Sequence, residues 1–505
     1  MVIVYLCGRM TELNLEAKDA GDWIYRGEGA ANLILAYNGS SPDFVGKVLR
    51  VQKVKRNGTN CEEVPSDLSV HEGLLWNEEC DLLSAPTREI AEHLYVQHVM
   101  SPRLGSNHVD AGVSIYITLS LKSSKTFLNF YLNILTTSQV RVLVSRDFLE
   151  SVEKNALSQR PSWRVSDADV NTQCDYALLI SDHSVFPQVL HDEELSISVE
   201  IKPKCGFLPS SNYIPDQHSI KKSMTRFKLH QTLKLLHKKV SQLSQYDPLD
   251  MFSGSKERIL KSIKDLFSTP QNNFRVFLNG SLVFGSLGGG KYRTNVRYDR
   301  ALEDALKFVI KATDGMRTTC FLELISEAVY RSGLLDRLLE VQKLDVFDIE
   351  GAIHAYYDVV SQPCVVCREL GEDKVSGRYS SLHSVPFDES LKIVKEYLIS
   401  ATAKDLSIMI SFRTREKKDP NSPYNVVFHE SIGQSFDYKV SFIDLDMKPL
   451  GKMMHYYELD QKIMRCCKKM MKNAKKPLEN HSENVEGKNN SYRDKSIVVE
   501  DDSPT

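Results

Sequence analysis

The sequence predicts an α+β protein with a strand-rich first lobe, a helix-rich second lobe and a cleft between them. Short runs of branched and aromatic residues, typical of strands, occupy residues 31–37, 44–52, 176–180 and 195–203. From residue 219 to 242, apolar residues instead recur every three to four positions, which indicates a helix. This change of pattern predicts a lobe boundary near residue 205.

The second part continues with helical patterns and contains two more strand-like runs. Helices are expected over residues 301–313, 317–343, 346–361, 389–403 and 452–473, and strands over 406–412 and 438–444. Residues beyond 473 contain few aromatic or branched side chains, so we expect a disordered tail. The predicted division is an N-terminal extension (1–17), a first lobe (18–205), a second lobe (206–473) and a tail (474–505).

Composition argues against several classes of protein. The 505 residues are 42% hydrophobic and 26% charged with a formal net charge of −2, which argues against a nucleic-acid-binding protein. The chain has no run of roughly 18–20 apolar residues, so no membrane span is expected. Only Cys364 and Cys367, of ten cysteines, have metal-type spacing, which favours a reduced intracellular protein of the cytoplasm, the nucleus or both. We expect a monomer.

A glycine-rich turn, YRGEGAAN (25–32), precedes the first predicted strand. Gly27 and Gly29 let backbone N–H groups approach a phosphate closely, as in kinase loops that cover ATP. The next strand supplies Lys47 and Arg50, either of which can reach a phosphate oxygen. An ordinary hairpin turn is the alternative, and these residues alone favour it.

Charged side chains alternate in the motif EIKPK. Glu200, Lys202 and Lys204 would point to one face of a strand, where the lysines would bind phosphates and Glu200 would fix a ribose or a lysine. The following helix carries three more polar residues on one face, Arg226, His230 and Lys234. A solvated sheet edge and a solvated helix face are the alternatives.

Two aspartates flank predicted apolar strands. Asp405 directly precedes one strand, and Asp444 ends another. Phosphoryl transfer needs one carboxylate to orient or deprotonate the attacking hydroxyl and another to hold Mg²⁺ against the phosphates. A catalytic aspartate followed by a metal aspartate is the kinase order, although aspartates are also common at strand ends.

Two thiols and two imidazoles can form a closed structural zinc site: His354, Cys364, Cys367 and His383. The cysteines have C-x₂-C spacing, but the histidine spacing is not that of a standard zinc finger. Two incidental thiols and two histidines with other partners are an equally weighted alternative.

These motifs, in this order, resemble the inositol-pentakisphosphate 2-kinase family, and its plant members closely. The matching segments, within about residues 18–470, are WIYRGEGAANLILAY, FVGKVLRVQK, EIKPKCGFLP, RFKLHQTLK, YDPLDMFSGSKE, STPQNNFRVFLNG, LSIMISF and FIDLDMKPL. The resemblance implies the two-lobed inositol phosphate kinase fold, distantly similar to protein kinases. It also implies that ATP, with Mg²⁺, phosphorylates the 2-hydroxyl of inositol 1,3,4,5,6-pentakisphosphate to give inositol hexakisphosphate (phytate).

The same resemblance implies residue roles. Asp405 would activate the 2-hydroxyl and Asp444 would hold Mg²⁺. Contacts to ATP would come from Gly29, Ala30, Ala31, Asn32, Arg50, Ser181, Asp182, His183, Glu200 and Arg275. Contacts to the inositol phosphate would come from Arg164, Lys202, Lys204, Lys234, Asn272, Lys448, Lys452 and Tyr456. Plant members also hold a structural zinc ion at the positions of His354, Cys364, Cys367 and His383.

Three features depart from the family pattern. Ser181 stands where plant relatives tend to have Asn. Lys452 stands where Arg is usual, which keeps the charge but loses bidentate phosphate geometry. An extra apolar, β-prone segment within residues 114–140 interrupts the first lobe, and we expect it to lower solubility and to be dispensable for turnover.

Two other functions compete with this one. A related kinase would use the same cationic residues for another phosphorylated alcohol. A non-catalytic, zinc-containing scaffold would bind inositol polyphosphates without turnover. The two aspartates and the EIKPK motif favour the enzyme.

Overall fold

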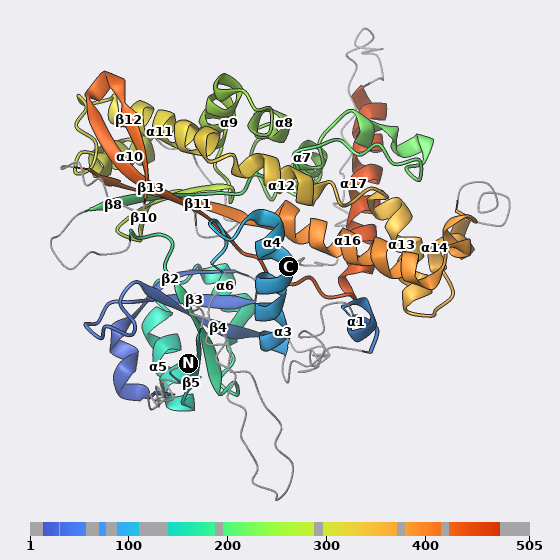
Figure 1. The fold of residues 1–505 in the computed structure, drawn as a ribbon, viewed down its shortest axis with the longest axis horizontal. Coiled ribbons are helices and arrows are strands. Elements are labelled where there is room, and N and C mark those ends of the chain that lie inside the picture. The colour runs from blue at the N-terminus through green and yellow to red at the C-terminus, as the bar shows by residue number, and fades with distance from the viewer. Residues whose placement is uncertain are drawn as a thin grey trace, which may run out of the picture.

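The computed structural model describes residues 14–29, 31–56, 70–76, 88–110, 140–186, 195–286, 296–370, 379–415 and 424–474. These residues form two lobes, each built on its own β-sheet, and most of the helices belong to the second lobe (Figure 1). The predictions for Ala30, for residues 1–13, for the segment from 114 to 139 and for the tail beyond Ala474 lie outside the described residues.

The first lobe contains a seven-stranded sheet in the order β1-β5-β7-β4-β3-β2, with β6 paired to β4. Its strands are β1 (Asn14–Leu15), β2 (Trp23–Glu28), β3 (Asn32–Tyr37), β4 (Lys47–Lys55), β5 (Val140–Val144), β6 (Ala168–Val170) and β7 (Tyr176–Ser181). β1 and β5 run parallel, and the other described pairs are antiparallel.

Short helices complete the first lobe: η1 (Ala17–Asp22), α5 (Arg146–Ala156) and α6 (Ser162–Asp167). The side chains of Phe148 and Leu149 in α5 are fully buried and share one core with Leu35 and Leu49 of the sheet. Burial of this apolar face against the strands holds the helix on the sheet.

The second lobe contains a six-stranded antiparallel sheet in the order β10-β9-β8-β11-β13-β12. Its strands are β8 (Ser196–Ile201), β9 (Phe274–Leu278), β10 (Ser281–Phe284), β11 (Ser407–Thr414), β12 (Asn425–His429) and β13 (Gln434–Ile443). Ile197, Val199 and Ile201 of β8 point into the main core, so the alternating residues Ser198 and Glu200 point to the opposite face.

The helices of this lobe cover the apolar face and one end of the sheet (Figure 1). They are η3 (Asp216–Lys222), α7 (Arg226–Leu236), α8 (Pro248–Met251), α9 (Lys256–Ser268), α10 (Val296–Leu306), α11 (Arg317–Ser332), α12 (Leu334–Gln342), α13 (Asp348–Val359), α14 (Val365–Leu370), η4 (Leu382–Ser384), α16 (Phe387–Asp405), η5 (Glu430–Ile432) and α17 (Lys452–Ala474). Among the described helices, none has the length and apolar character needed to cross a bilayer.

The position of β8 corrects the predicted lobe boundary. β8 pairs with β9 and β11, so the change from the first sheet to the second falls between β7 and β8 and not near residue 205. Strand pairing joins segments that lie far apart in the chain, and composition along the chain does not reveal it.

Two predicted helices are interrupted. The run expected over 317–343 is α11 and α12, which meet at Gly333 with a left-handed φ of 62°. The run expected over 219–242 is η3 followed by α7, and Thr225 caps α7 by accepting a hydrogen bond from the N–H of Lys228. Apolar spacing continues across both junctions, so periodicity alone predicts one continuous helix in each case.

A helical segment from the first part of the chain packs in the second lobe. It comprises α1 (Val70–Leu75), α3 (Arg88–Leu94), η2 (Tyr95–Met100) and α4 (Ser101–Leu104). Trp76 and Tyr95 belong to the main core of the second lobe, and the Tyr95 hydroxyl donates to Thr402 Oγ1 of α16 at 3.2 Å. The first 205 residues therefore contain more helix, and mix more with the second lobe, than the pattern predicted.

Candidate active site

One face of the second sheet is turned toward the first lobe (Figure 1). Charged side chains of this sheet are joined by hydrogen bonds. Glu200 Oε2 of β8 accepts from Arg275 Nη1 of β9 at 2.7 Å. The hydroxyl of Ser407 in β11 lies 2.9 Å from Glu200 Oε1 and 3.2 Å from Asp444 Oδ2. Three residues predicted for nucleotide binding, Glu200, Arg275 and Asp444, therefore lie together, and Ser407 links them.

Asp444 directly follows β13 and has a φ of 63°, a conformation rare for a residue other than glycine. Lys202 Nζ lies 3.0 Å from its Oδ2, and the aspartate side chain is 54% exposed. Partial desolvation by the surrounding protein would raise the pKa of Asp444, but Lys202, Arg50 and Arg275 hold it well below its usual range. Asp444 is therefore a carboxylate at neutral pH, and carboxylate oxygens are the ligands that Mg²⁺ prefers.

Asp405 is the last residue of α16. The sequence had predicted only that Asp405 directly precedes a strand, and not that it ends a helix. Lys204 Nζ lies 3.4 Å from its Oδ1, and Lys448 Nζ lies 3.4 Å from its Oδ2. The surrounding protein would raise the pKa of Asp405, but Lys204, Lys448 and Lys202 lower it below its usual value. Asp405 is therefore charged at neutral pH.

The two lysines of EIKPK face different aspartates. β8 ends at Ile201, so Lys202 and Lys204 lie beyond the strand, and simple alternation does not place them. Lys202 pairs with Asp444, whereas Lys204, with a φ of 60°, pairs with Asp405. The motif thus connects the two carboxylates.

Further cations converge on Asp405 from other elements. Burial lowers the pKa of Lys204 to about 8, and the charges of Lys202 and Lys234 act in the same direction while Asp405 opposes them. Burial also lowers the pKa of Lys452 in α17, and Lys448 and Lys55 add to this effect. Lysines that repel one another in this way favour a polyanionic ligand. Lys55 of β4 was not predicted, and it brings a cation from the first lobe.

Uncharged groups complete this cluster. Burial raises the pKa of Tyr456 in α17, and Asp405 adds to the effect. Burial, Lys234 and Arg226 lower the pKa of His230 to about 3, so this imidazole is neutral. Asn272 precedes Asn273, whose carbonyl accepts from the N–H of Lys202 at 2.9 Å.

The first lobe meets the second at Arg50. Its guanidinium makes a bidentate pair with the carboxylate of Asp446, with both N–O distances 2.6 Å. The amide oxygen of Asn32, when turned toward Arg50, accepts from Nη2 at 2.7 Å and Nε at 3.0 Å. The N–H of Gly29 donates to the Asn32 carbonyl at 2.9 Å, which closes the glycine-rich turn. Asp446, two residues after Asp444, was not predicted as a site residue.

Ser181, Asp182 and His183 lie where the chain passes from the first sheet to the second. The N–H of Asp182 donates to the Gly46 carbonyl at 2.9 Å. The hydroxyl of Ser411 in β11 donates to the His183 carbonyl at 2.6 Å. The segment is thus bonded to both lobes, which is the place of a hinge.

Arg164 lies in the first lobe. It belongs to α6, and its guanidinium lies 4.2 Å from the centre of the Trp163 ring. Burial lowers the pKa of Arg164 and Glu28 opposes this effect. Within the described ranges, the charged and polar groups with the largest effects on the pKa of Arg164 besides Glu28 are Asp167 and Tyr25, also of the first lobe.

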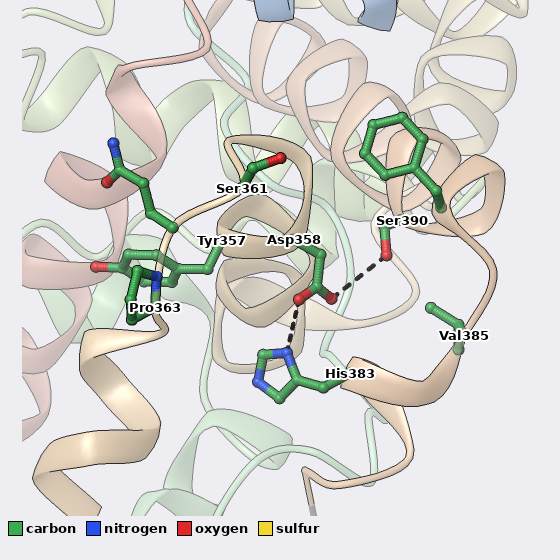
Figure 2. Close-up of a pocket in the computed structure, with 9 residues that line it drawn as sticks. Tyr357, Asp358, Ser361, Pro363, His383, Val385 and Ser390 are labelled. Atoms are coloured by element: carbon green, nitrogen blue, oxygen red, sulfur yellow. Dashed lines mark hydrogen bonds and ion pairs between the residues drawn. The ribbon is translucent and has the colours of Figure 1, made fainter.

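The predicted zinc ligands come together from α13, α14, η4 and Cys364, which directly precedes α14. One donor atom from each of His354, Cys364, Cys367 and His383 lies within 4.8 Å of the others. Cys367 Sγ is 3.2 Å from both His354 Nδ1 and His383 Nε2. Asp358 Oδ1 lies 2.8 Å from His383 Nδ1 and orients its ring (Figure 2). Two thiols and two imidazoles in this arrangement fit a closed zinc site.

A pocket of about 490 Å³ opens beside these ligands. Figure 2 shows the Asp358 carboxylate between His383 and Ser390 in its wall. Phe387, which also lines the pocket, and Asp405 are the first and last residues of α16, so roughly 27 Å of helix separates them. The pocket therefore belongs to the candidate zinc site and not to the site around the two aspartates.

Two lobes joined by a hinge, with two aspartates among converging lysines between them, define a two-lobed, kinase-like phosphotransferase. A family model described as inositol-pentakisphosphate 2-kinase matches residues 25–462. The chain belongs to this family.

Individual relatives agree. The chain is 53% identical over 456 residues to the inositol-pentakisphosphate 2-kinase of Arabidopsis thaliana, covering 90% of this chain and 94% of that one. It is 49% identical over 453 residues to a protein of Oryza sativa subsp. indica named inositol-pentakisphosphate 2-kinase IPK1, covering 90% and 95%. A relative from Danio rerio with the same family name is 27% identical over 527 residues, covering 90% and 94%.

Proposed function

We propose that this protein transfers the γ-phosphoryl group of ATP to the 2-hydroxyl of inositol 1,3,4,5,6-pentakisphosphate, giving inositol hexakisphosphate and ADP. One observation carries the proposal. The EIKPK segment connects a carboxylate suited to Mg²⁺, Asp444, with a carboxylate surrounded by lysines, Asp405. Nucleotide and polyphosphate would therefore meet between these two aspartates.

The nucleotide would lie between the lobes. Ser181, Asp182 and His183 would contact the adenine, and the turn of Gly29, Ala30, Ala31 and Asn32 would cover the phosphates together with Arg50. Glu200 and Arg275 would contact the rest of the nucleotide. Asp444 would hold Mg²⁺, which neutralises charge on the transferred phosphoryl group.

The inositol phosphate would lie on the side of Asp405. Its phosphates would be bound by Lys202, Lys204, Lys234, Asn272, Lys448, Lys452 and Tyr456. Arg164 would join them from the first lobe.

Asp405 would orient the 2-hydroxyl. Because its pKa is lowered, Asp405 is a weak base that accepts a hydrogen bond from the hydroxyl and takes the proton as the oxygen bonds to the γ-phosphorus. The bond from that phosphorus to the ADP oxygen breaks in the same displacement. Correct placement of the substrate phosphates aims the hydroxyl, so binding and catalysis use the same contacts.

Zinc, held by His354, Cys364, Cys367 and His383, would fix the segment from α13 to η4 without taking part in the reaction. We further propose that the protein acts as a monomer in the cytoplasm, the nucleus or both, on small-molecule substrates, without nucleic-acid or membrane partners.

Substrate profiling tests the proposed function. Purified protein with ATP and Mg²⁺ should convert the pentakisphosphate with a free 2-hydroxyl to the hexakisphosphate. Isomers whose 2-position is already phosphorylated should not react, because no acceptor is presented to Asp405. Faster turnover of a different phosphorylated alcohol would reassign the substrate, and binding without ADP release would identify a scaffold.

A further inference from the structure

A buried side-chain amide links the backbones that carry Asp405 and Lys204. Gln342, the last residue of α12, is fully buried, and its Nε2 donates to the carbonyls of Lys204 at 2.9 Å and Ala403 at 3.1 Å. Its Oε1 accepts from the N–H of Gly206 at 2.8 Å. We propose that Gln342 is a positioning residue for the acceptor side of the reaction, an inference that rests on the proposed function.

The bond to Ala403 acts on the end of α16. The last carbonyls of a helix have no partner within the helix, and the final turn frays unless other groups satisfy them. Asp405 is the terminal residue, two positions after Ala403. The Gln342 amide therefore holds the turn from which the Asp405 carboxylate projects.

The bonds to Lys204 and Gly206 act on the loop after β8. Lys204 has a φ of 60°, which is costly for a lysine and persists only where surrounding bonds enforce it. On the C-terminal side of Lys204, Gln342 holds the peptide groups. On its N-terminal side, the buried hydroxyl of Tyr246 donates to the Pro203 carbonyl at 2.8 Å. This backbone shape directs Lys204 toward Asp405.

One amide therefore sets the spacing between a carboxylate and a lysine that are 3.4 Å apart. The groups proposed for the nucleotide, which include Arg50, Glu200 and Arg275, have other partners. Loss of Gln342 should consequently disturb the acceptor and spare ATP. A general loss of stability would not separate the two substrates in this way.

The variant Gln342→Met tests the inference, because it keeps length and apolar volume but removes all three bonds. We expect the KM for inositol pentakisphosphate to rise roughly 10-fold and kcat to fall roughly 10-fold, since small displacements at a reacting centre are costly. The KM for ATP should change less than about twofold.

Gln434→Met is the matched control. Gln434 is a buried glutamine that bridges the N–H of Lys311 and the carbonyl of Val309, both at 2.9 Å. It should lower the melting temperature to a similar extent while both KM values stay unchanged.

Tyr246→Phe provides a test if Gln342→Met does not fold. This variant removes only the bond to Pro203, so it should raise the KM for inositol pentakisphosphate with kcat nearly unchanged. If the wild type is active, two results would overturn the inference: Gln342→Met changes the KM values for inositol pentakisphosphate and ATP equally, or it changes neither. An inactive wild type would instead refute the proposed function.

Discussion

Lys204 is held in an unusual electrostatic state. Burial and the neighbouring lysines Lys202 and Lys234 lower its pKa to about 8, although Asp405 is close. Below that pH its ammonium is charged and attracts substrate phosphate, and above it the side chain becomes neutral. Its contribution to binding is therefore present at neutral pH and lost as the pH rises through about 8.

A pH profile follows from this state. We expect kcat/KM for inositol pentakisphosphate to fall with an apparent pKa near 8, because this ratio reports ionisations of the free enzyme. In Lys204→Arg the guanidinium stays charged, so the alkaline fall should disappear even if the maximum is lower. Identical profiles for the two proteins would contradict the role of Lys204.

At the scale of residues, the sequence patterns did not predict contacts. The motif EIKPK identified Glu200, Lys202 and Lys204, but it did not show that the two lysines face different aspartates. Lys204 turns through a left-handed backbone conformation, which no local pattern required. Gln342 and Ser407 gave no signal at all, because a buried amide or hydroxyl acts through distant partners.

Among the elements, α13, the segment around α14 and η4 are joined by a small set of polar side chains. Four donor atoms join them, and Asp358 of α13 orients His383. A carboxylate that accepts from a ligating histidine fixes the tautomer and increases the basicity of the ring.

Changing this carboxylate should weaken the metal site. In Asp358→Asn we expect zinc affinity to fall roughly 10- to 100-fold, measured by competition with a chromophoric chelator. Asp314→Asn, at a carboxylate that is 81% exposed, is the control and should bind zinc as the wild type does. Zinc-free wild-type protein, or unchanged affinity in Asp358→Asn, would count against a zinc site at these ligands.

Element types were predictable where periodicity was long, and element boundaries were not. The pattern over 317–343 was helical, yet Gly333 divides it because glycine takes the left-handed φ of 62° with little strain. β8 was predicted as a strand, but its partners β9 and β11 are distant in the chain, so its lobe was assigned wrongly.

At the scale of the molecule, the pair of Arg50 and Asp446 joins the lobes. The two side chains are 22% and 40% exposed, so their pairing contributes at most about 1 kcal/mol to stability. Its effect should appear in the arrangement of the lobes, because it connects β4 with the segment after β13.

Small-angle scattering of the ligand-free protein tests this effect. Asp446→Asn should increase the radius of gyration by loosening the lobes. Asp169→Asn removes a comparable exposed pair with Arg56 inside the first lobe and should leave the radius unchanged. Equal radii for both variants would show that the pair does not hold the lobes together.

The two-lobed plan was predictable from the order of strand-rich and helix-rich segments. How distant parts of the chain meet was not, since the pair of Arg50 and Asp446, between the lobes, and the bond of Tyr95 to Thr402, within the second lobe, join residues more than 300 positions apart. Such contacts depend on three-dimensional packing that periodicity and composition do not describe.

Asp405 provides the most direct test of the proposed reaction. In Asp405→Asn, ATP-dependent formation of inositol hexakisphosphate should fall by roughly 10²-fold or more, because the 2-hydroxyl loses its acceptor. Calorimetry should show that inositol pentakisphosphate still binds, as tightly or more so, since a negative charge is removed from between Lys204 and Lys448. Turnover within about threefold of the wild type would contradict the assignment of Asp405 and of the site built around it.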